Sequence, residues 1–206
     1  MWRGRQRIEC RPIRTEDNRQ SAIDMTTYIA LLRGINVTGH KIIRMEALRA
    51  LFEALGYRQV KTYVQSGNVI FEAGKDAKLA GKIEKKIMAE FGFNVSVLVK
   101  TPGEMAQVIR DNPFPKPAGI DDSRLYVTFL SAPAPPTAEN ALKGLATAQE
   151  QFHVGDREIY LCCPNGYGKT KLSNSAIEKK LGVVATTRNW KTVNALLALA
   201  QSQGLQ

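Results

Sequence analysis

The order in which short β-rich runs alternate with helical patterns constrains this chain more than any other feature of its sequence. In the N-terminal half, helical periodicity separates the first β-rich run from the second and the third from the fourth. The strands are expected at 28–32, 60–65, 68–72 and 95–100, and the helices at 45–55 and 79–91. This strand–helix–strand–strand–helix–strand order predicts a split βαβ unit, in which two helices cover one face of an antiparallel sheet.

The same order returns in the C-terminal half. Strands are expected at 125–130, 151–154, 158–162 and 183–187, with helices at 137–145 and 174–181 and a closing helix from Trp190. Thr137 is the expected N-cap of the first of these helices. The chain is therefore predicted to be an α+β protein made of two tandem ferredoxin-like units, also called α/β-plait units.

A short helix and a proline-rich stretch separate the two predicted units. The sequence Thr101-Pro102-Gly103-Glu104 is typical of a capping box and predicts a helix that ends near Asp111. Three prolines then block regular structure. We expect a first unit with its linker helix at 25–111, a linker at 112–123 and a second unit at 124–206. Residues 1–24 hold six arginines without apolar periodicity and are expected to be a disordered extension.

Composition excludes several classes of protein. A chain of 206 residues with 44% hydrophobic and 23% charged residues is expected to fold. Its net charge of +10 favours an anionic partner: a nucleotide, RNA, a phosphorylated metabolite or a membrane surface. No apolar run approaches the roughly 20 residues that span a bilayer, so integral membrane association is not expected. Three cysteines and no signal-peptide core favour the cytoplasm.

Four polar segments that follow or join the predicted strands are candidates for a ligand site, because glycine-rich loops with amide and basic side chains suit anions. The candidate ligand-binding residues are Arg33, Gly34, Asn36, Ser66, Gly67, Asn68, Asn165, Gly166, Gly168, Lys169, Lys171, Arg188, Asn189 and Trp190. Chain direction predicts that 33–39 lies beside 66–67, and 165–171 beside 188–190.

Each candidate also has a structural interpretation. Arg33 could form a salt bridge, Asn36 and Asn68 could cap turns, Asn189 could cap the closing helix, and Trp190 could belong to the core. Lys169 and Lys171 could be solvated charges on a turn.

The sequence favours no particular catalytic chemistry. Gly168-Lys169-Thr170 is not a P-loop, because Cys163 stands where the motif requires glycine. Nothing places His40 or His153 beside a nucleophile, and Ser66 lacks the glycines of a nucleophile elbow. We therefore predict no catalytic residue, no metal site and no cofactor.

Several motifs resemble those of a known family. They are Leu32–Val37, Tyr63–Val69, Pro164–Gly168, Lys171–Ser173 and Ala185–Trp190. With these motifs, the stretch from Met25 to about Ala200 resembles the bacterial domain-of-unknown-function family numbered 1697. The resemblance implies two ferredoxin-like units in tandem and leaves the activity open. Residues 1–24 have no place in the family's pattern.

Two classes of function remain. The first is a binding module for an anionic ligand, a nucleotide or RNA, held on the polar loops. The second is an enzyme that acts on a phosphorylated small molecule, with Arg33, Lys169, Lys171 and Arg188 holding its charge. A protein–protein interaction module is a further alternative, and the sequence leaves the oligomeric state open.

Overall fold

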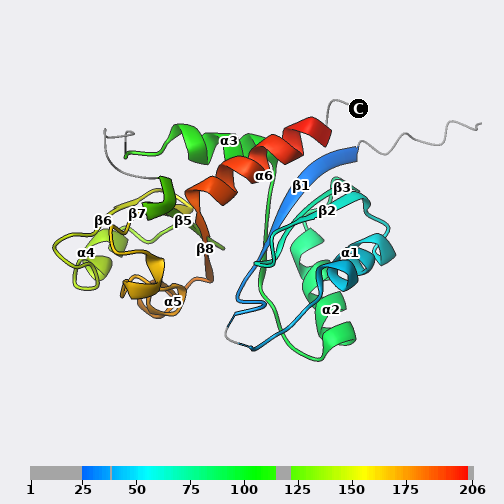
Figure 1. Ribbon diagram of the computed structural model, residues 1–206, viewed down its shortest axis with the longest axis horizontal. Helices are drawn as coiled ribbons and strands as arrows, with labels where there is room; N and C mark the ends of the chain where they lie inside the picture. Colours follow the sequence, from blue (N-terminus) through cyan, green and yellow to red (C-terminus); the bar gives the residue numbers. More distant parts are fainter. Residues whose placement is uncertain (1–24, 38, 115–121, 204–206) are drawn as a thin grey trace, which may run out of the picture.

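The computed structural model describes residues 25–37, 39–114 and 122–203, and these residues form two four-stranded antiparallel sheets (Figure 1). The first sheet has the order β2-β3-β1-β4, with β1 (Met25–Leu32), β2 (Arg58–Tyr63), β3 (Asn68–Gly74) and β4 (Val97–Lys100). The second has the order β6-β7-β5-β8, with β5 (Leu125–Leu130), β6 (Gln151–Val154), β7 (Glu158–Cys162) and β8 (Ala185–Asn189). The chain is an α+β protein, and its two sheets repeat one strand order.

Six α-helices of the described residues pack in pairs. In the N-terminal half, α1 (Met45–Ala54) and α2 (Leu79–Phe91) cover the outer face of the first sheet (Figure 1). In the C-terminal half, α4 (Ala138–Lys143) and α5 (Asn174–Leu181) cover the outer face of the second. The other two, α3 (Pro102–Arg110) and α6 (Trp190–Gln203), lie across both sheets at one end. Two 3₁₀ turns occur at Asp122–Arg124 and Tyr167–Lys169.

Strand β1 is buried on both faces. Ala30 and Leu32 pack against α1 and α2, whereas Ile29 and Leu31 point to the opposite side and pack against the C-terminal half. Two buried faces explain why this strand is a continuous apolar run and does not alternate. The inner core that contains Ile29 also holds side chains of β5, β7, α3 and α6, so the two halves share one core.

Most expected elements are present with local differences: β1 begins at Met25, three residues earlier than expected, and β4 begins at Val97, two residues later. The capping box at Thr101 is confirmed, but Thr137 has helical backbone angles and makes no side-chain cap. The turn between β2 and β3 comprises four residues, because Tyr63 pairs directly with Asn68. Strand β8 begins two residues later than predicted and continues to Asn189, which pairs with Tyr126 of β5.

The adjacent cysteines lie on opposite sides of the second sheet. Cys162 packs in the shared core and Cys163 in the outer core, and both thiols are free. Burial raises the pKa of the Cys163 thiol to about 11, which makes it unreactive at neutral pH.

Two expectations concern residues that this structure does not describe. The extension at 1–24 lies outside the described residues, and so does 115–121 of the linker. In the described part, no helix is long and apolar enough to cross a membrane.

Candidate functional site: the motif loops at the junction of the two halves

The loop that follows β1 lies beside the turn between β2 and β3, as chain direction predicts. The backbone N–H of Leu32 donates to the Gly67 carbonyl at 2.8 Å, and the Asn36 side chain donates to the Gln65 carbonyl at 2.9 Å. Gly67 has a φ of +74°, and a Cβ there would stand 2.8 Å from the Leu32 Cβ. Only glycine fits this close approach.

The loop between β7 and α5 reaches β8 at Thr187, one residue before the predicted segment 188–190. Tyr167, in the loop between β7 and α5, places its hydroxyl 3.0 Å from the Thr187 hydroxyl on β8. Thr187 in turn donates to the Asn174 side chain at 2.7 Å and lies 2.7 Å from the Thr128 hydroxyl. Burial raises the pKa of Tyr167, so this network stays uncharged at neutral pH.

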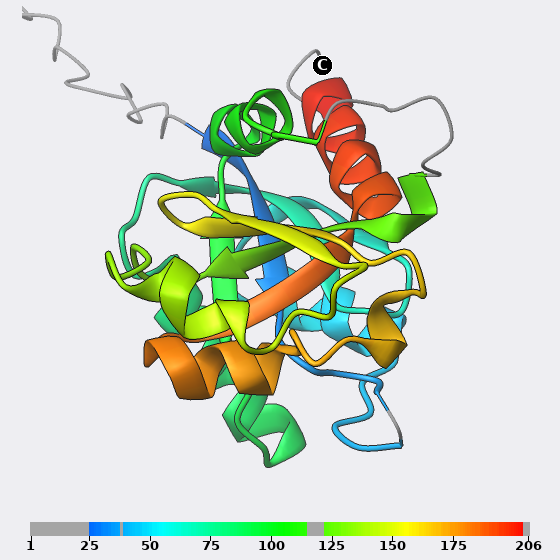
Figure 2. The ribbon, with the colours of Figure 1, turned by 90° about the vertical axis from the view of Figure 1, so that its left-hand side faces the viewer.

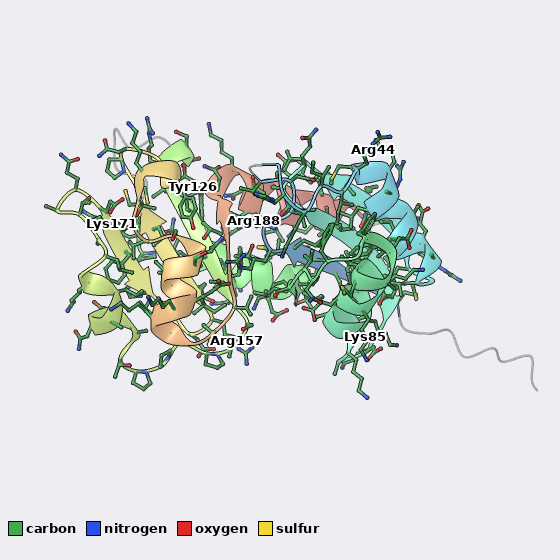
Figure 3. All side chains as sticks on the ribbon, turned by 90° about the horizontal axis from the view of Figure 1, so that it is seen from below. Arg44, Lys85, Tyr126, Arg157, Lys171 and Arg188 are labelled. Carbon is green, nitrogen blue, oxygen red and sulfur yellow. The ribbon has the colours of Figure 1, made fainter. Side chains whose placement is uncertain are left out.

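Arg188 joins the two loop pairs. Its side chain extends from β8 toward the N-terminal half and is only 6% exposed (Figure 3). Its guanidinium donates to oxygen atoms on both halves, and these are Asn68 Oδ1, Thr186 Oγ1 and the carbonyls of Leu32, Gly67 and Thr187. Burial lowers the pKa of Arg188 to about 10, which still leaves it charged at neutral pH. All five N–H groups are used within the protein.

Arg33 makes a second connection between the halves. Its Nε and one terminal nitrogen donate to the two carboxylate oxygens of Glu178 on α5, at 2.5 and 2.6 Å. The same carboxylate accepts the backbone N–H of Ala185 at 3.0 Å. The hydrogen bond with Glu178 raises the pKa of Arg33. This bidentate pair is the salt bridge that the sequence left open as an alternative.

The two asparagines hold loop backbone in place. Asn36, at a φ of +56°, donates to Ile43 and Gln65 carbonyls and accepts the Ile43 N–H at 2.8 Å. Asn68 is fully buried, and its amide donates to the Tyr63 carbonyl at 3.0 Å while its oxygen accepts from Arg188. Both asparagines therefore make the turn-capping contacts that their structural interpretation predicts.

Trp190 lies in the core, which is the structural interpretation that the sequence left open for it. Its side chain is 7% exposed and packs in the shared core with residues of α3 and β5, because it starts the apolar stripe of α6. It offers no stacking platform for a base. Asn189 beside it accepts the Lys191 N–H at 2.9 Å and donates to the Ser123 carbonyl at 3.2 Å, which ties the start of α6 to the 3₁₀ turn before β5.

The remaining candidates lie at the surface. Asn165, Gly168, Lys169 and Lys171 are exposed on the loop between β7 and α5, whereas Gly166 and Gly34 are half-buried. Ser66 is exposed too, and it accepts a hydrogen bond from Asn68 at 3.0 Å. Figure 3 places Lys171 on the outside of the C-terminal half, away from the junction at Arg188.

Sequence reasoning missed four residues that complete these clusters: Arg124, Tyr167, Asn174 and Glu178. The sequence contains one indication of the role of Glu178, because it is the one acidic residue between Asn165 and the chain end. It is therefore the carboxylate in that segment that could pair with a distant cation. Tyr167 stands inside one of the motifs. Nothing in the sequence pointed to Arg124, whose guanidinium would lie 3.4 Å from a Cβ at Gly166.

Two cavities border the loops. One of about 390 Å³ lies at the start of α1, with Asn36 and Gln65 in its wall. The other, of about 540 Å³, lies between the halves and is lined by Arg33 and Glu178 among others. In the described part of the chain, no three or more His, Cys, Asp or Glu side chains gather where they could hold a metal ion.

The fold and the junction define a class of protein: two similar α+β halves that share a core and are fastened together by motif residues. The chain belongs to the family described as "Protein of unknown function (DUF1697)", which matches residues 25–160. This match ends before the last three motifs, so it is shorter than the resemblance read from the sequence. No curated protein matches the chain.

A solved structure supports the same arrangement. The chain is similar to conserved bacterial protein SP0830 from Streptococcus pneumoniae, with a TM-score of 0.67 and 22% sequence identity. The likeness covers 85% of this chain and 99% of that one. At this identity it concerns the fold alone.

Proposed function

We propose that the chain is a binding module for an anionic ligand, a nucleotide or RNA, held on the loop between β7 and α5. The observation that carries the proposal is a group of three exposed cations on and beside this loop: Arg124, Lys169 and Lys171. Among the described residues, none of the three has an ion pair. A cluster of cations that are not paired with carboxylates attracts phosphate groups.

The surroundings of the loop reinforce its positive charge. Between Asn165 and the chain end there are six basic residues and one acidic residue. That acidic residue, Glu178, is already paired with Arg33. Its charge is therefore neutralised locally, which leaves this segment with a positive net charge. Arg124 lies against the loop, since its guanidinium would be 3.4 Å from a Cβ at Gly166.

The internal residues act as positioning residues for this surface. Arg188 and Arg33 fix the C-terminal half against the N-terminal half, and Tyr167 fixes the loop to β8. A rigid scaffold that presents an exposed loop is the usual arrangement of a binding site. Arg33, Asn36, Asn68 and Arg188 therefore support the site through the fold and do not touch the ligand.

The test is a titration of labelled single-stranded RNA and of a panel of nucleotides at two salt concentrations. If RNA binds, the logarithm of affinity falls with the logarithm of salt by roughly 0.7 per phosphate neutralised. Replacing Lys169 and Lys171 together by Gln should weaken binding and make this slope shallower by about one to two such steps.

The matched control replaces Lys179 and Lys180 by Gln, which removes the same charge from the exposed face of α5 in the same half. An equal loss with both pairs would assign the binding to overall charge and contradict a loop site. Absence of binding by folded protein to every probe would overturn the proposal and favour a protein–protein role.

One observation favours the enzyme alternative, in which the ligand is a phosphorylated small molecule. The cavity between the halves has Arg33, Lys41, Asn94 and Ser96 in its lining, and clefts between domains commonly hold substrates. Binding there would depend on geometry more than on salt. Arg33→Lys keeps the charge and loses the planar guanidinium. It would then weaken nucleotide binding more than the loop substitutions do.

We also propose that each half is a ferredoxin-like unit, with the boundaries 25–111 and 124–206 and a linker between them. The shared strand order and the placement of two helices on one face of each sheet support this classification. A cytoplasmic location is proposed on the basis of the free, buried cysteines. Fractionation of cells that express the tagged chain would test the location.

A further inference from the structure

Exposed apolar side chains gather on two loops at one end of the first sheet. Of the four large hydrophobic side chains that are strongly exposed in the described residues, three are Val37, Ile42 and Val64, at 54%, 66% and 52%. The first two belong to the loop between β1 and α1, and Val64 belongs to the turn between β2 and β3. Asn36 holds these loops together through the Gln65 carbonyl. Single exposed hydrophobics are ordinary, but several on joined loops indicate a binding surface.

Both loops contribute to the lining of the cavity of about 390 Å³ at the start of α1, and of these three side chains Ile42 belongs to that lining. We call it the α1 cavity. Its lining combines apolar side chains with amides and two opposite charges, and consists of Asn36, Gly39, Ile42, Ile43, Arg44, Met45, Glu46 and Gln65. The volume lies in the range of small-molecule sites, and an apolar lining with a few polar groups is their usual composition.

Charge at the α1 cavity favours a single negative head group. Arg44 lines the cavity, is exposed, and has no ion pair among the described residues. Lys41 does not add to this charge, because it lines the cavity between the halves and its ammonium donates to the Asn94 carbonyl at 2.6 Å. Glu46 is the one carboxylate in the lining, and it would repel a ligand that carries several negative charges. A monoanion therefore suits this cavity better than a polyphosphate does.

We propose that the α1 cavity binds a small amphipathic monoanion, a molecule with a short apolar body and one anionic head. Ile42 and its apolar neighbours cover the body, and Arg44 holds the head. This site does not depend on the proposed function, because it uses other residues. Figure 3 places Arg44 and Lys171 at opposite ends of the molecule.

The test compares probes that share a six-carbon chain and differ in the head: hexanoate, hexyl phosphate, hexylamine and 1-hexanol. Amide chemical shifts of the full chain are followed by NMR during titration. Hexanoate should give saturable shifts centred on Asn36, Gly39 and Gln65, with the amine and the alcohol at least about tenfold weaker, since an ionic hydrogen bond contributes about that factor. A stronger response to hexyl phosphate would identify a phosphate head within the same class.

Variants distinguish binding at the α1 cavity from non-specific binding to exposed apolar side chains. Ile42→Asp and Arg44→Gln should each raise the Kd for hexanoate by about tenfold or more. The control is Met88→Asp on α2, which removes the fourth exposed hydrophobic, 44% exposed, and should leave the Kd unchanged. All three side chains are exposed, so thermal unfolding should remain near that of the parent protein.

Three results would overturn the proposal: no saturable shift with either anionic probe, equal loss of affinity in Ile42→Asp and Met88→Asp, or shifts centred outside the α1 cavity. RNA titration of Ile42→Asp is the remaining control. Unchanged RNA binding together with lost hexanoate binding would support two separate sites, and loss of both together would contradict the separation.

Discussion

Replacing Arg188 by methionine tests whether this residue fastens the two halves together. Methionine retains an unbranched stem that fills much of the same space, so the main loss is electrostatic. Five hydrogen bonds from a charged donor, at about 1.5 kcal/mol each, amount to roughly 7 kcal/mol. Burial lowers the pKa of Arg188 to about 10, which corresponds to a cost of about 3 kcal/mol for the buried charge. Replacing Arg188 by methionine removes this cost.

The expected net loss is therefore about 4 kcal/mol in the free energy of unfolding, a large part of the total for a chain of this size. In a chain of this length, each kcal/mol lost from the free energy of unfolding lowers the melting temperature by about 2–4 °C. The melting temperature should therefore fall by about 10 °C. Urea unfolding followed by circular dichroism measures the first quantity, and calorimetry measures the second.

The matched control is Arg157→Met. Arg157 is exposed, and its nearest carboxylate oxygen, on Asp156, is 4.0 Å away. It should change the free energy of unfolding by less than about 0.5 kcal/mol. A similarly small change in Arg188→Met would refute the reasoning, because the buried contacts would then contribute nothing net to the junction.

Three further predictions follow from the loops and the interface. Gly67→Ala should lower the free energy of unfolding by about 2–4 kcal/mol, because the new Cβ would stand 2.8 Å from the Leu32 Cβ. Gly34 also has a positive φ but open space around it, so Gly34→Ala should cost about 1 kcal/mol. Urea unfolding compares the two variants. A double-mutant cycle with Arg33→Met and Glu178→Gln should give a coupling of about 1 kcal/mol that shrinks with added salt, and a coupling of zero would reduce the pair to a surface contact. Burial, opposed by Lys100, raises the pKa of Glu158, so its contribution to stability is present below the unfolded pKa and lost as pH rises through the folded one. Glu158→Gln should therefore gain stability relative to the parent as the pH rises above the unfolded pKa, and parallel stability curves would contradict the assignment.

The sequence predicted the elements and their pairing because both depend on local information. Alternating runs, helical stripes and the capping box at Thr101 are set by residues close together in the chain. Chain direction then placed the loop after β1 beside Gly67, and the hydrogen bond from Leu32 to Gly67 follows from it. The sequence did not predict the end of β8, because its last two residues are polar. They belong to the strand only because they pair with β5.

The roles of the arginines required information that no local pattern contains. Arg188 and Arg33 were candidate ligand residues because each follows or ends a strand beside a glycine-containing loop. Whether such a side chain meets solvent or another half depends on how the two sheets pack, and that packing is set by the shared core of Ile29, Phe129 and Trp190. Once that core forms, β8 lies against the end of β1, and the oxygen atoms of Leu32 and Asn68 take the positions that a bound anion would need. The same motifs therefore hold the two halves together at the junction, and the proposed ligand site uses Lys169 and Lys171, which the packing leaves exposed.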